Sequence, residues 1–164
     1  MTAMAVTILG IDPGLHITGY GAIESNGSQI KILEAGVIRT PAREDFQGKL
    51  KEIYNEMGSI LEQFKPDYMA VEELYSHYAH PKTAIIMGHA RGTIFIRAAL
   101  NNIPIVSYAS TRIKKSLTGN GRATKMQMQR MIKSTLKLTD DVYSPDTADA
   151  LAAALCHHNA LMGK

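Results

Sequence analysis

The segment TILGIDPGLHITGYGAIE, residues 7–24, ends a buried-looking strand on a charged residue. An apolar run, Val6–Ile11, leads directly into Asp12, and Pro13 and Gly14 then turn the chain toward a second strand-like run. Asp before Pro-Gly is a common turn residue, so turn formation alone accounts for its position. The end of a buried strand is also a position where a functional carboxylate would lie. Both interpretations stay open until partners for Asp12 are found.

Four glycines lie close to Asp12 in the sequence. Glycine weakens the interior of a strand, so its presence there indicates that something large has to come close. Gly10 and Gly14 flank the carboxylate, while Gly19 and Gly21 fall where a facing strand would pass it. We therefore expect Asp12 to stand at a strand end with cleared space around it.

The composition is that of one globular domain spanning residues 1–164, with 45% hydrophobic and 20% charged residues. No apolar stretch is long enough to span a bilayer, and the first residues lack the basic start of a signal peptide. Cys156 is the single cysteine, which excludes an internal disulfide and agrees with a reducing, cytoplasmic location.

Positive charge is concentrated in one part of the chain. Residues 109–138 hold eight Lys or Arg and no Asp or Glu, whereas the remainder holds ten basic and fifteen acidic residues. A basic run often forms a solvated helix face, but the absence of acids over thirty residues favours a surface for a polyanion, with nucleic acid first. In this run, Arg122 and Lys125 of the glycine-rich segment TGNGRATK are candidate phosphate contacts, and Arg112 is a further candidate.

Residue periodicity predicts an α/β domain in which a three-stranded antiparallel meander precedes alternating helices and strands. The final helix has clear start signals, because Ser144 suits the N-cap and Pro145 the first helical position. The expected elements are strands at Val6–Asp12, Ile17–Glu24 and Gln29–Thr40, a helix from Leu50 to Phe64, a strand within residues 67–74, a helix at Thr83–Leu100, a strand at Pro104–Tyr108, short basic helices, and the final helix.

The predicted helix Thr83–Leu100 is apolar on more than one face, so it needs more than one packing partner. The sheet supplies one. The other is either more of the core or a second copy of the chain across a two-fold axis, and we favour the homodimer.

Four carboxylates are placed so that they can meet. Asp12 and Glu72 each end a predicted buried strand, and neighbouring parallel strands would bring those ends about 5 Å apart. Asp146 and Asp149 lie three residues apart on one face of the last helix. Asp146 also suits a helix N-terminus, whereas Asp149 lies among Ala and Leu, which suggests burial.

Such a cluster of acids, expected to lack matching basic partners, would need cations. Oxygen ligands of this kind select Mg²⁺ or Mn²⁺ rather than zinc, and two such ions can activate a water and stabilise a leaving oxygen in phosphodiester hydrolysis. Beside a basic surface, this chemistry indicates a nuclease. Cys156, His157 and His158 do not form a zinc site, because consecutive helix positions point in different directions.

The motifs LGIDPG, TGYG, PDYMAVEELY, GHARG, YASTRIKKSLTGNGRATK and DTADALAAAL occur in this order over nearly the whole chain. Together they resemble the RuvC family of Holliday-junction resolvases. The resemblance implies a ribonuclease-H-like fold with a five-stranded mixed sheet flanked by helices. It also implies a homodimer that resolves four-way DNA junctions in recombination and repair by paired, symmetric, Mg²⁺-dependent nicks. A branch-migration helicase complex is a further partner that it suggests.

Carried over by position, the resemblance assigns catalytic metal binding to Asp12, Glu72, Asp146 and Asp149. It places Lys114 and Lys125 near the scissile phosphate and the bound strand, and Tyr75 where an aromatic residue engages bases at the junction. Glu73 falls outside the motif.

Two other functions remain to be tested. Actin- and hexokinase-like ATPases also place GIDxG between two early strands, but they need a second lobe for which this chain has no room. A non-catalytic junction-binding protein of the same fold is the other alternative, although it would be expected to lack one or more of the four acids.

Overall fold

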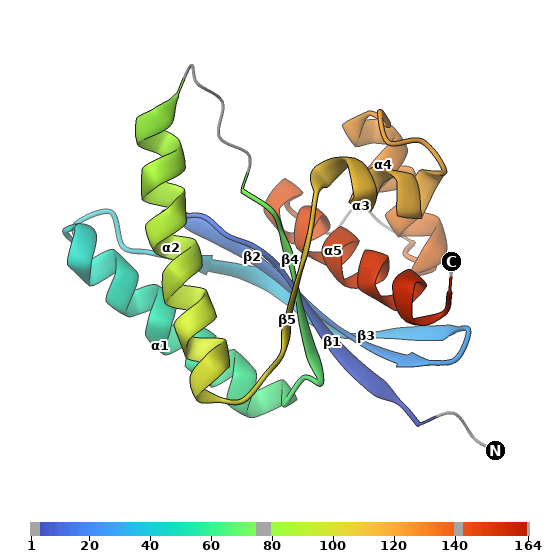
Figure 1. Cartoon of the computed structure of the whole chain (residues 1–164), viewed down its shortest axis with the longest axis horizontal. Coiled ribbons are helices and arrows are strands. Elements are labelled where there is room, and N and C mark those ends of the chain that lie inside the picture. The colour runs from blue at the N-terminus through green and yellow to red at the C-terminus, as the bar shows by residue number, and fades with distance from the viewer. Residues whose placement is uncertain (1–3, 75–79, 140–142, 164) are drawn as a thin grey trace.

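A computed structural model gives the fold and describes residues 4–74, 80–139 and 143–163 (Figure 1). Five strands and five helices are described. In chain order they are β1 (Val6–Asp12), β2 (Ile17–Asn26), β3 (Gln29–Arg39), α1 (Phe46–Phe64), β4 (Tyr68–Glu72), α2 (Pro81–Leu100), β5 (Ile105–Tyr108), α3 (Ser110–Thr118), α4 (Lys125–Thr135) and α5 (Pro145–Leu161).

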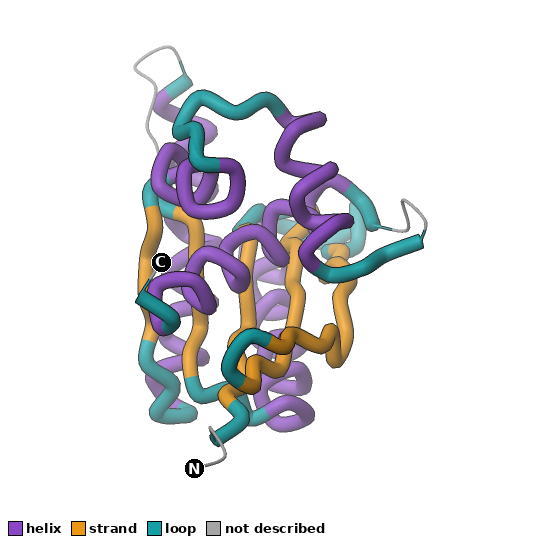
Figure 2. Tube along the Cα trace, turned by 90° about the vertical axis from the view of Figure 1, so that its right-hand side faces the viewer, coloured by secondary structure: helices purple, strands orange, loops and turns teal. Residues whose placement is uncertain are grey.

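The strands form one mixed sheet in the order β3-β2-β1-β4-β5. The pairs β1–β2 and β2–β3 are antiparallel, whereas β1–β4 and β4–β5 are parallel. Helices α1 and α2 cover one face of this sheet, and α3, α4 and α5 lie on the other (Figure 1). Figure 2 looks onto the second face, where helices lie in front of the orange strands. The predicted five-stranded mixed sheet is confirmed.

Alternation along the strands divides the core into two layers. Ile8 and Ala70 pack with the apolar face of α5, while their neighbours Leu9 and Met69 pack with α1 and α2. Side chains two residues apart share a face of a strand. The side chains of Asp12 and Glu72 therefore leave the sheet on the face covered by α5.

The ends of the elements follow local signals. The Asp45 side chain accepts a hydrogen bond from Gly48 N and starts α1 four residues before the apolar pattern does. Strand β4 stops at Glu72, two residues earlier than the predicted segment, and α2 begins two residues earlier, at Pro81. Ser144 caps α5 as predicted, because its Oγ accepts from Thr147 N at 3.3 Å.

The glycines of β1 and β2 let α5 lie directly against the sheet. A Cβ on Gly10 would collide with the main chain of Ala150, and one on Gly19 would collide with that of Asp146. The Leu151 side chain fills the space above Gly21. The expectation of cleared space around Asp12 was therefore wrong in one respect: Gly10, Gly19 and Gly21 accommodate a helix. That helix carries two of the predicted site residues.

Candidate active site

Asp12 and Glu72 lie side by side at the carboxyl ends of β1 and β4. These strands run parallel in a register that pairs Ile11 with Val71, so the next residues of the two strands are adjacent. Neighbouring strands are about 4.8 Å apart, and equal register puts both side chains on the same face. The juxtaposition predicted from the two strand ends is present.

Helix α5 brings the other two acids to the same end of the sheet. Asp12 pairs across the β1–β2 hairpin with Gly19, and the Asp146 carbonyl lies against Gly19. Asp149 is one turn further along α5 on the same helix face. The close approach at glycine is thus what sets α5, and with it both carboxylates, beside Asp12.

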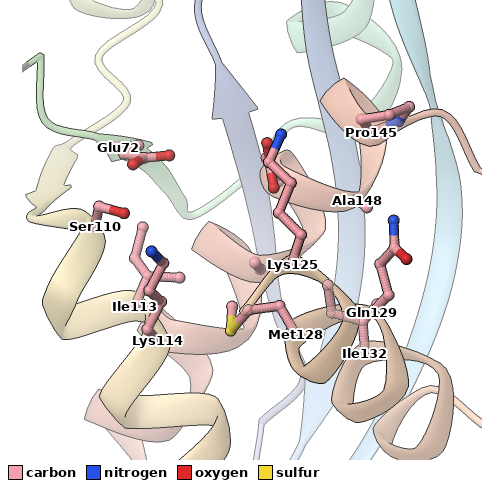
Figure 3. Close-up of a pocket in the computed structure, with 12 residues that line it drawn as sticks. Glu72, Ser110, Ile113, Lys114, Lys125, Met128, Gln129, Ile132, Pro145 and Ala148 are labelled. Atoms are coloured by element: carbon pink, nitrogen blue, oxygen red, sulfur yellow. The ribbon is translucent and has the colours of Figure 1, made fainter. Parts of the chain in front are cut away.

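A cavity of about 190 Å³ opens between β4, α3, α4 and α5 (Figure 3). Its floor is apolar, formed largely by buried residues of the three helices. Figure 3 shows the charged and polar groups that border this floor, with Lys125 extending from α4 toward the sheet. The lining residues are Glu72, Ser110, Ile113, Lys114, Lys125, Met128, Gln129, Ile132, Pro145, Ala148, Asp149 and Ala152.

A second cavity, of about 240 Å³, borders Asp12 and Glu72 from the side of α2. Its other lining residues include Leu74, Met87 and Arg91. Glu72 therefore stands between two cavities, one on each side of the end of the sheet. The site is open to a ligand larger than a single ion.

The acids interact electrostatically with one another. Burial, and then the charges of Asp149, Glu72 and Asp146, raise the pKa of the Asp12 carboxyl to about 7. Burial also raises the pKa of Glu72 and of Asp149. Each ionised carboxylate disfavours the charge on its neighbours.

Two lysines oppose this repulsion. The resemblance placed both of them near the scissile phosphate, but the reasoning from the residues alone expected the acids to have no basic partners. Lys114 of α3 and Lys125 of α4 line the first cavity, and both lower the pKa of Glu72 and of Asp149. The expectation that the acids lack matching basic residues was wrong. The first cavity holds both signs of charge, with Glu72 and Asp149 beside the two lysines.

The remaining predicted contacts lie elsewhere. Arg112 is exposed on α3 with its guanidinium 5.7 Å from the centre of the Tyr108 ring, and Arg122 is exposed in the turn before α4. Neither lines the carboxylate cavity. Tyr75 falls outside the described residues.

The adjacent residues Cys156, His157 and His158 point to different partners. His157 Nδ1 lies 2.7 Å from the Tyr108 hydroxyl, whereas His158 Nδ1 lies 2.8 Å from Ser25 Oγ on the other side of α5. These contacts give each histidine a separate place in the core.

Sequence reasoning missed two residues at the site. Ser110 hydrogen-bonds to the Glu72 side chain and lowers the pKa of its carboxyl. Arg91 of α2 donates hydrogen bonds to the Glu72 main-chain carbonyl and to Ser107 Oγ. Both residues belong to motifs quoted for the resemblance, Ser110 to YASTRIKKSLTGNGRATK and Arg91 to GHARG, but neither residue was given a role.

The sequence model of the family described as "Crossover junction endodeoxyribonuclease RuvC" matches residues 8–157. The chain belongs to the RuvC family. A RuvC from Rhodopirellula baltica is 45% identical over 154 residues, which cover 94% of this chain and 86% of that one. A RuvC from Alkaliphilus oremlandii is 45% identical over 150 residues, covering 92% and 91%.

Solved RuvC structures have the same fold. The Thermus thermophilus RuvC in complex with a Holliday junction substrate superposes with a TM-score of 0.90 at 27% identity, over 96% of both chains. A Thermus thermophilus RuvC structure gives a TM-score of 0.86 at 30% identity, over 98% of this chain and 97% of that one. The resemblance to RuvC and the ribonuclease-H-like fold are confirmed. Among the described residues, no helix combines the length and apolar character needed to cross a bilayer.

Proposed function

We propose that this chain resolves four-way DNA junctions by hydrolysing phosphodiester bonds at the cluster of Asp12, Glu72, Asp146 and Asp149. One observation carries the proposal. Acids from β1, β4 and α5 meet beside two lysines, in a chain that belongs to a family of crossover junction endodeoxyribonucleases.

The donor set fits hard divalent cations. All four side chains are carboxylates, and oxygen donors suit Mg²⁺ or Mn²⁺. Within residues 4–74, 80–139 and 143–163, no three acidic, His or Cys side chains already surround a single point. Cation binding would draw the carboxylates inward and relieve the repulsion that raises the pKa of Asp12. We propose two ions, whose chemistry is to activate a water and stabilise the leaving oxygen.

The chain's own residues supply binding and orientation. Lys114 and Lys125 would hold the negatively charged phosphate of the strand against the carboxylate cluster. Arg112 and Arg122, which are both exposed, would contact phosphates further along the DNA. Tyr75 is proposed to stack on a base at the junction centre.

We further propose that two copies pair through α2. Ile85, Ile96 and Leu100 are 64%, 52% and 61% exposed and share one face of the helix. Gly92 lies between them with no atom near its missing side chain, which lets a second helix cross closely. A two-fold dimer presents two equivalent sites to a junction that is itself two-fold symmetric.

The setting of the reaction stays a prediction. A lone, buried Cys156 suits a reducing cytoplasm, and a branch-migration helicase complex is the proposed partner that would deliver junctions. Of the two alternatives, the ATPase finds no support in the family match, and the non-catalytic binder would not need all four acids.

The decisive experiment compares a synthetic four-way junction with a linear duplex of matched sequence, each with and without Mg²⁺. We expect symmetric nicks in the junction alone and only with the metal. Asp12→Asn should bind the junction normally and cut it at least about a hundredfold more slowly. Normal cutting by Asp12→Asn, or equal cutting of the duplex, would overturn the proposal.

A further inference from the structure

Arg91 contacts the end of β4 from the face opposite to the Glu72 carboxylate. Its Nη1 donates a hydrogen bond to the main-chain carbonyl of Glu72, and its Nη2 donates one to Ser107 Oγ at 2.8 Å. Ser107 pairs with Val71, whose side chain belongs to the α1–α2 layer. The guanidinium thus reaches β4 and β5 together from α2.

The peptide group that follows Glu72 is held at both of its polar atoms. The N–H of Glu73 donates to the Tyr108 carbonyl at 2.8 Å, which continues the pairing with β5. The carbonyl of Glu72 accepts from Arg91. Holding both ends of this peptide fixes ψ at Glu72 and therefore the direction in which its side chain leaves the strand.

The guanidinium is itself held in place. Its Cζ lies 4.6 Å from the centre of the Phe95 ring, one turn along α2, and the residue is half-buried. The Glu72 carboxylate leaves the sheet on the face opposite to α2, and Arg91 contacts Glu72 at its main-chain carbonyl. The contact of Arg91 with Glu72 is therefore made through the main chain.

We propose that Arg91 is a positioning residue for divalent-metal binding, because its bridge between the Glu72 carbonyl and Ser107 sets the direction of the Glu72 carboxylate. This inference rests on the proposed function of Glu72 as a metal ligand. It also gives the GHARG motif a physical role at the site. Lysine is a poor replacement for this arginine, because its ammonium lacks the planar fork that reaches two separate acceptors while stacking on a ring.

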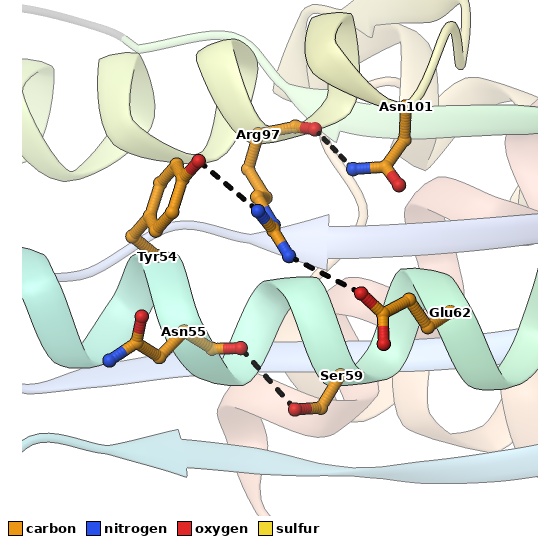
Figure 4. A network of polar contacts seen from close by, with 6 residues as sticks. All are labelled: Tyr54, Asn55, Ser59, Glu62, Arg97 and Asn101. Carbon is orange, nitrogen blue, oxygen red and sulfur yellow. Dashed lines mark hydrogen bonds and ion pairs between the residues drawn. The ribbon is translucent and has the colours of Figure 1, made fainter.

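Arg97 provides a matched control on the same helix. Figure 4 shows it between Tyr54 and Glu62 of α1. Its Nη1 donates to the Tyr54 hydroxyl at 3.1 Å, and its guanidinium lies 4.6 Å from that ring and 3.6 Å from Glu62 Oε1. Arg97 joins α2 to α1 and lies away from the four acids of the site. Its replacement therefore measures the stability that is lost with an arginine of α2 when the site itself is unchanged.

The test measures Mn²⁺ affinity by calorimetry in the absence of DNA, together with the Mg²⁺ concentration for half-maximal nicking. We expect Arg91→Lys to weaken Mn²⁺ binding about tenfold and to raise the half-saturating Mg²⁺ by a similar factor. Ser107→Ala, which removes one of the two acceptors, should weaken both by a smaller factor. Arg97→Lys should lower the melting temperature while leaving both metal constants at the wild-type value.

The outcomes separate this inference from the proposed function. If wild type binds Mn²⁺ and cuts junctions, but Arg91→Lys and Ser107→Ala bind Mn²⁺ as wild type does, the positioning role is wrong and the function stands. Equal loss of metal affinity in Arg91→Lys and Arg97→Lys would also overturn it, because the effect would then be general loosening of α2. If wild type neither binds Mn²⁺ nor cuts, both proposals fall.

Discussion

Asp12 lies half-buried beside three other carboxylates, and without a cation each of them raises the free energy of the others in the folded state. The unfolded chain separates these charges. The site therefore opposes folding when no metal is bound, as strained functional sites commonly do.

From this repulsion we expect Asp12→Asn to stabilise the metal-free protein. In mildly alkaline buffer with a chelator, the variant should gain on the order of 1 kcal/mol, which is about 2–4 °C in melting temperature for a chain of this size. Added Mg²⁺ should raise the melting temperature of wild type more than that of the variant. Scanning calorimetry with and without Mg²⁺ measures both effects.

Asp67→Asn is the control for this comparison. Asp67 Oδ2 accepts a hydrogen bond from Thr7 N at 2.8 Å at the opposite end of the sheet, and an asparagine oxygen can accept the same bond. This variant should show no metal-free gain. A lower melting temperature for Asp12→Asn in chelator would contradict the argument.

His157 should make the fold sensitive to mild acid. It is 5% exposed, its Nδ1 contacts the Tyr108 hydroxyl, and its buried Nε2 has no hydrogen-bond partner. Burial lowers the pKa of His157 below its ordinary value of 6.5. The unfolded state therefore takes up the proton first as the pH falls, so stability is fully present above about 6.5 and decreases below it.

His157→Gln removes this titration while keeping a polar partner for Tyr108. We expect the variant to be less stable than wild type at neutral pH and the difference to shrink as the pH falls below about 6.5. Urea unfolding at a series of pH values measures it. Exposed His16→Gln is the control, and a constant difference between His157→Gln and wild type would refute the assignment.

At the scale of elements, the sequence predicted those features that depend on local signals. The strand that ends on Asp12, the strand that ends near Glu72 and the Ser144 cap of the last helix each follow from alternation, turn residues or capping. These signals place an acid at the end of each of two strands and two acids near the start of the last helix, but they do not bring the acids together. The resemblance then supplied the topology.

The sequence predictions that were wrong depended on how distant segments of the chain pack together. Gly10 and Gly19 were interpreted as clearing space for a site, whereas they receive the main chain of α5. Lys114 and Lys125 were assigned to DNA, but their position against the carboxylates depends on how α3 and α4 pack beside α5. No local pattern contains that information.

Glycine-to-alanine substitution is expected to have opposite effects on stability at Gly10, where α5 lies against β1, and at Gly88 in α2. Gly10→Ala would drive a Cβ into the main chain of Ala150 and should cost on the order of 3 kcal/mol. Gly88→Ala, in α2, meets only Leu74 Cδ2 at 3.9 Å and should stabilise by about 0.5–1 kcal/mol, because alanine favours a helix.

Chemical denaturation of the two variants checks the signs. Gly10→Ala should also lose metal affinity, since displacing α5 moves Asp149 away from Asp12. A Gly10→Ala variant as stable as wild type would mean that α5 does not lie against β1 as described.

For the whole molecule, the proposed dimer would let two sites act on one junction, and its pairing surface can be tested. The exposed face of α2 gathers Ile85, Ile96 and Leu100 on one side of the helix, while Ala90 and Ile94 are buried against the core on the other. Isolated apolar residues at a surface are ordinary, but three of them on one helix face, with Gly92 between them, favour an interface.

We therefore expect Ile96→Asp to separate the dimer, because pairing would bury two unpartnered carboxylates at the centre of the interface. Sedimentation should show a dimer for wild type and a monomer for the variant. Leu161→Asp, a similar change at a 46% exposed position at the end of α5, should remain dimeric.

A supercoiled plasmid that carries a cruciform tests the effect of Ile96→Asp on cleavage. Two cuts within one bound complex linearise it, whereas independent cuts give nicked circles, so Ile96→Asp should shift the product from linear to nicked. A dimeric Ile96→Asp would place the pairing surface outside α2, and a monomeric wild type that still linearises the plasmid would refute the proposed dimer.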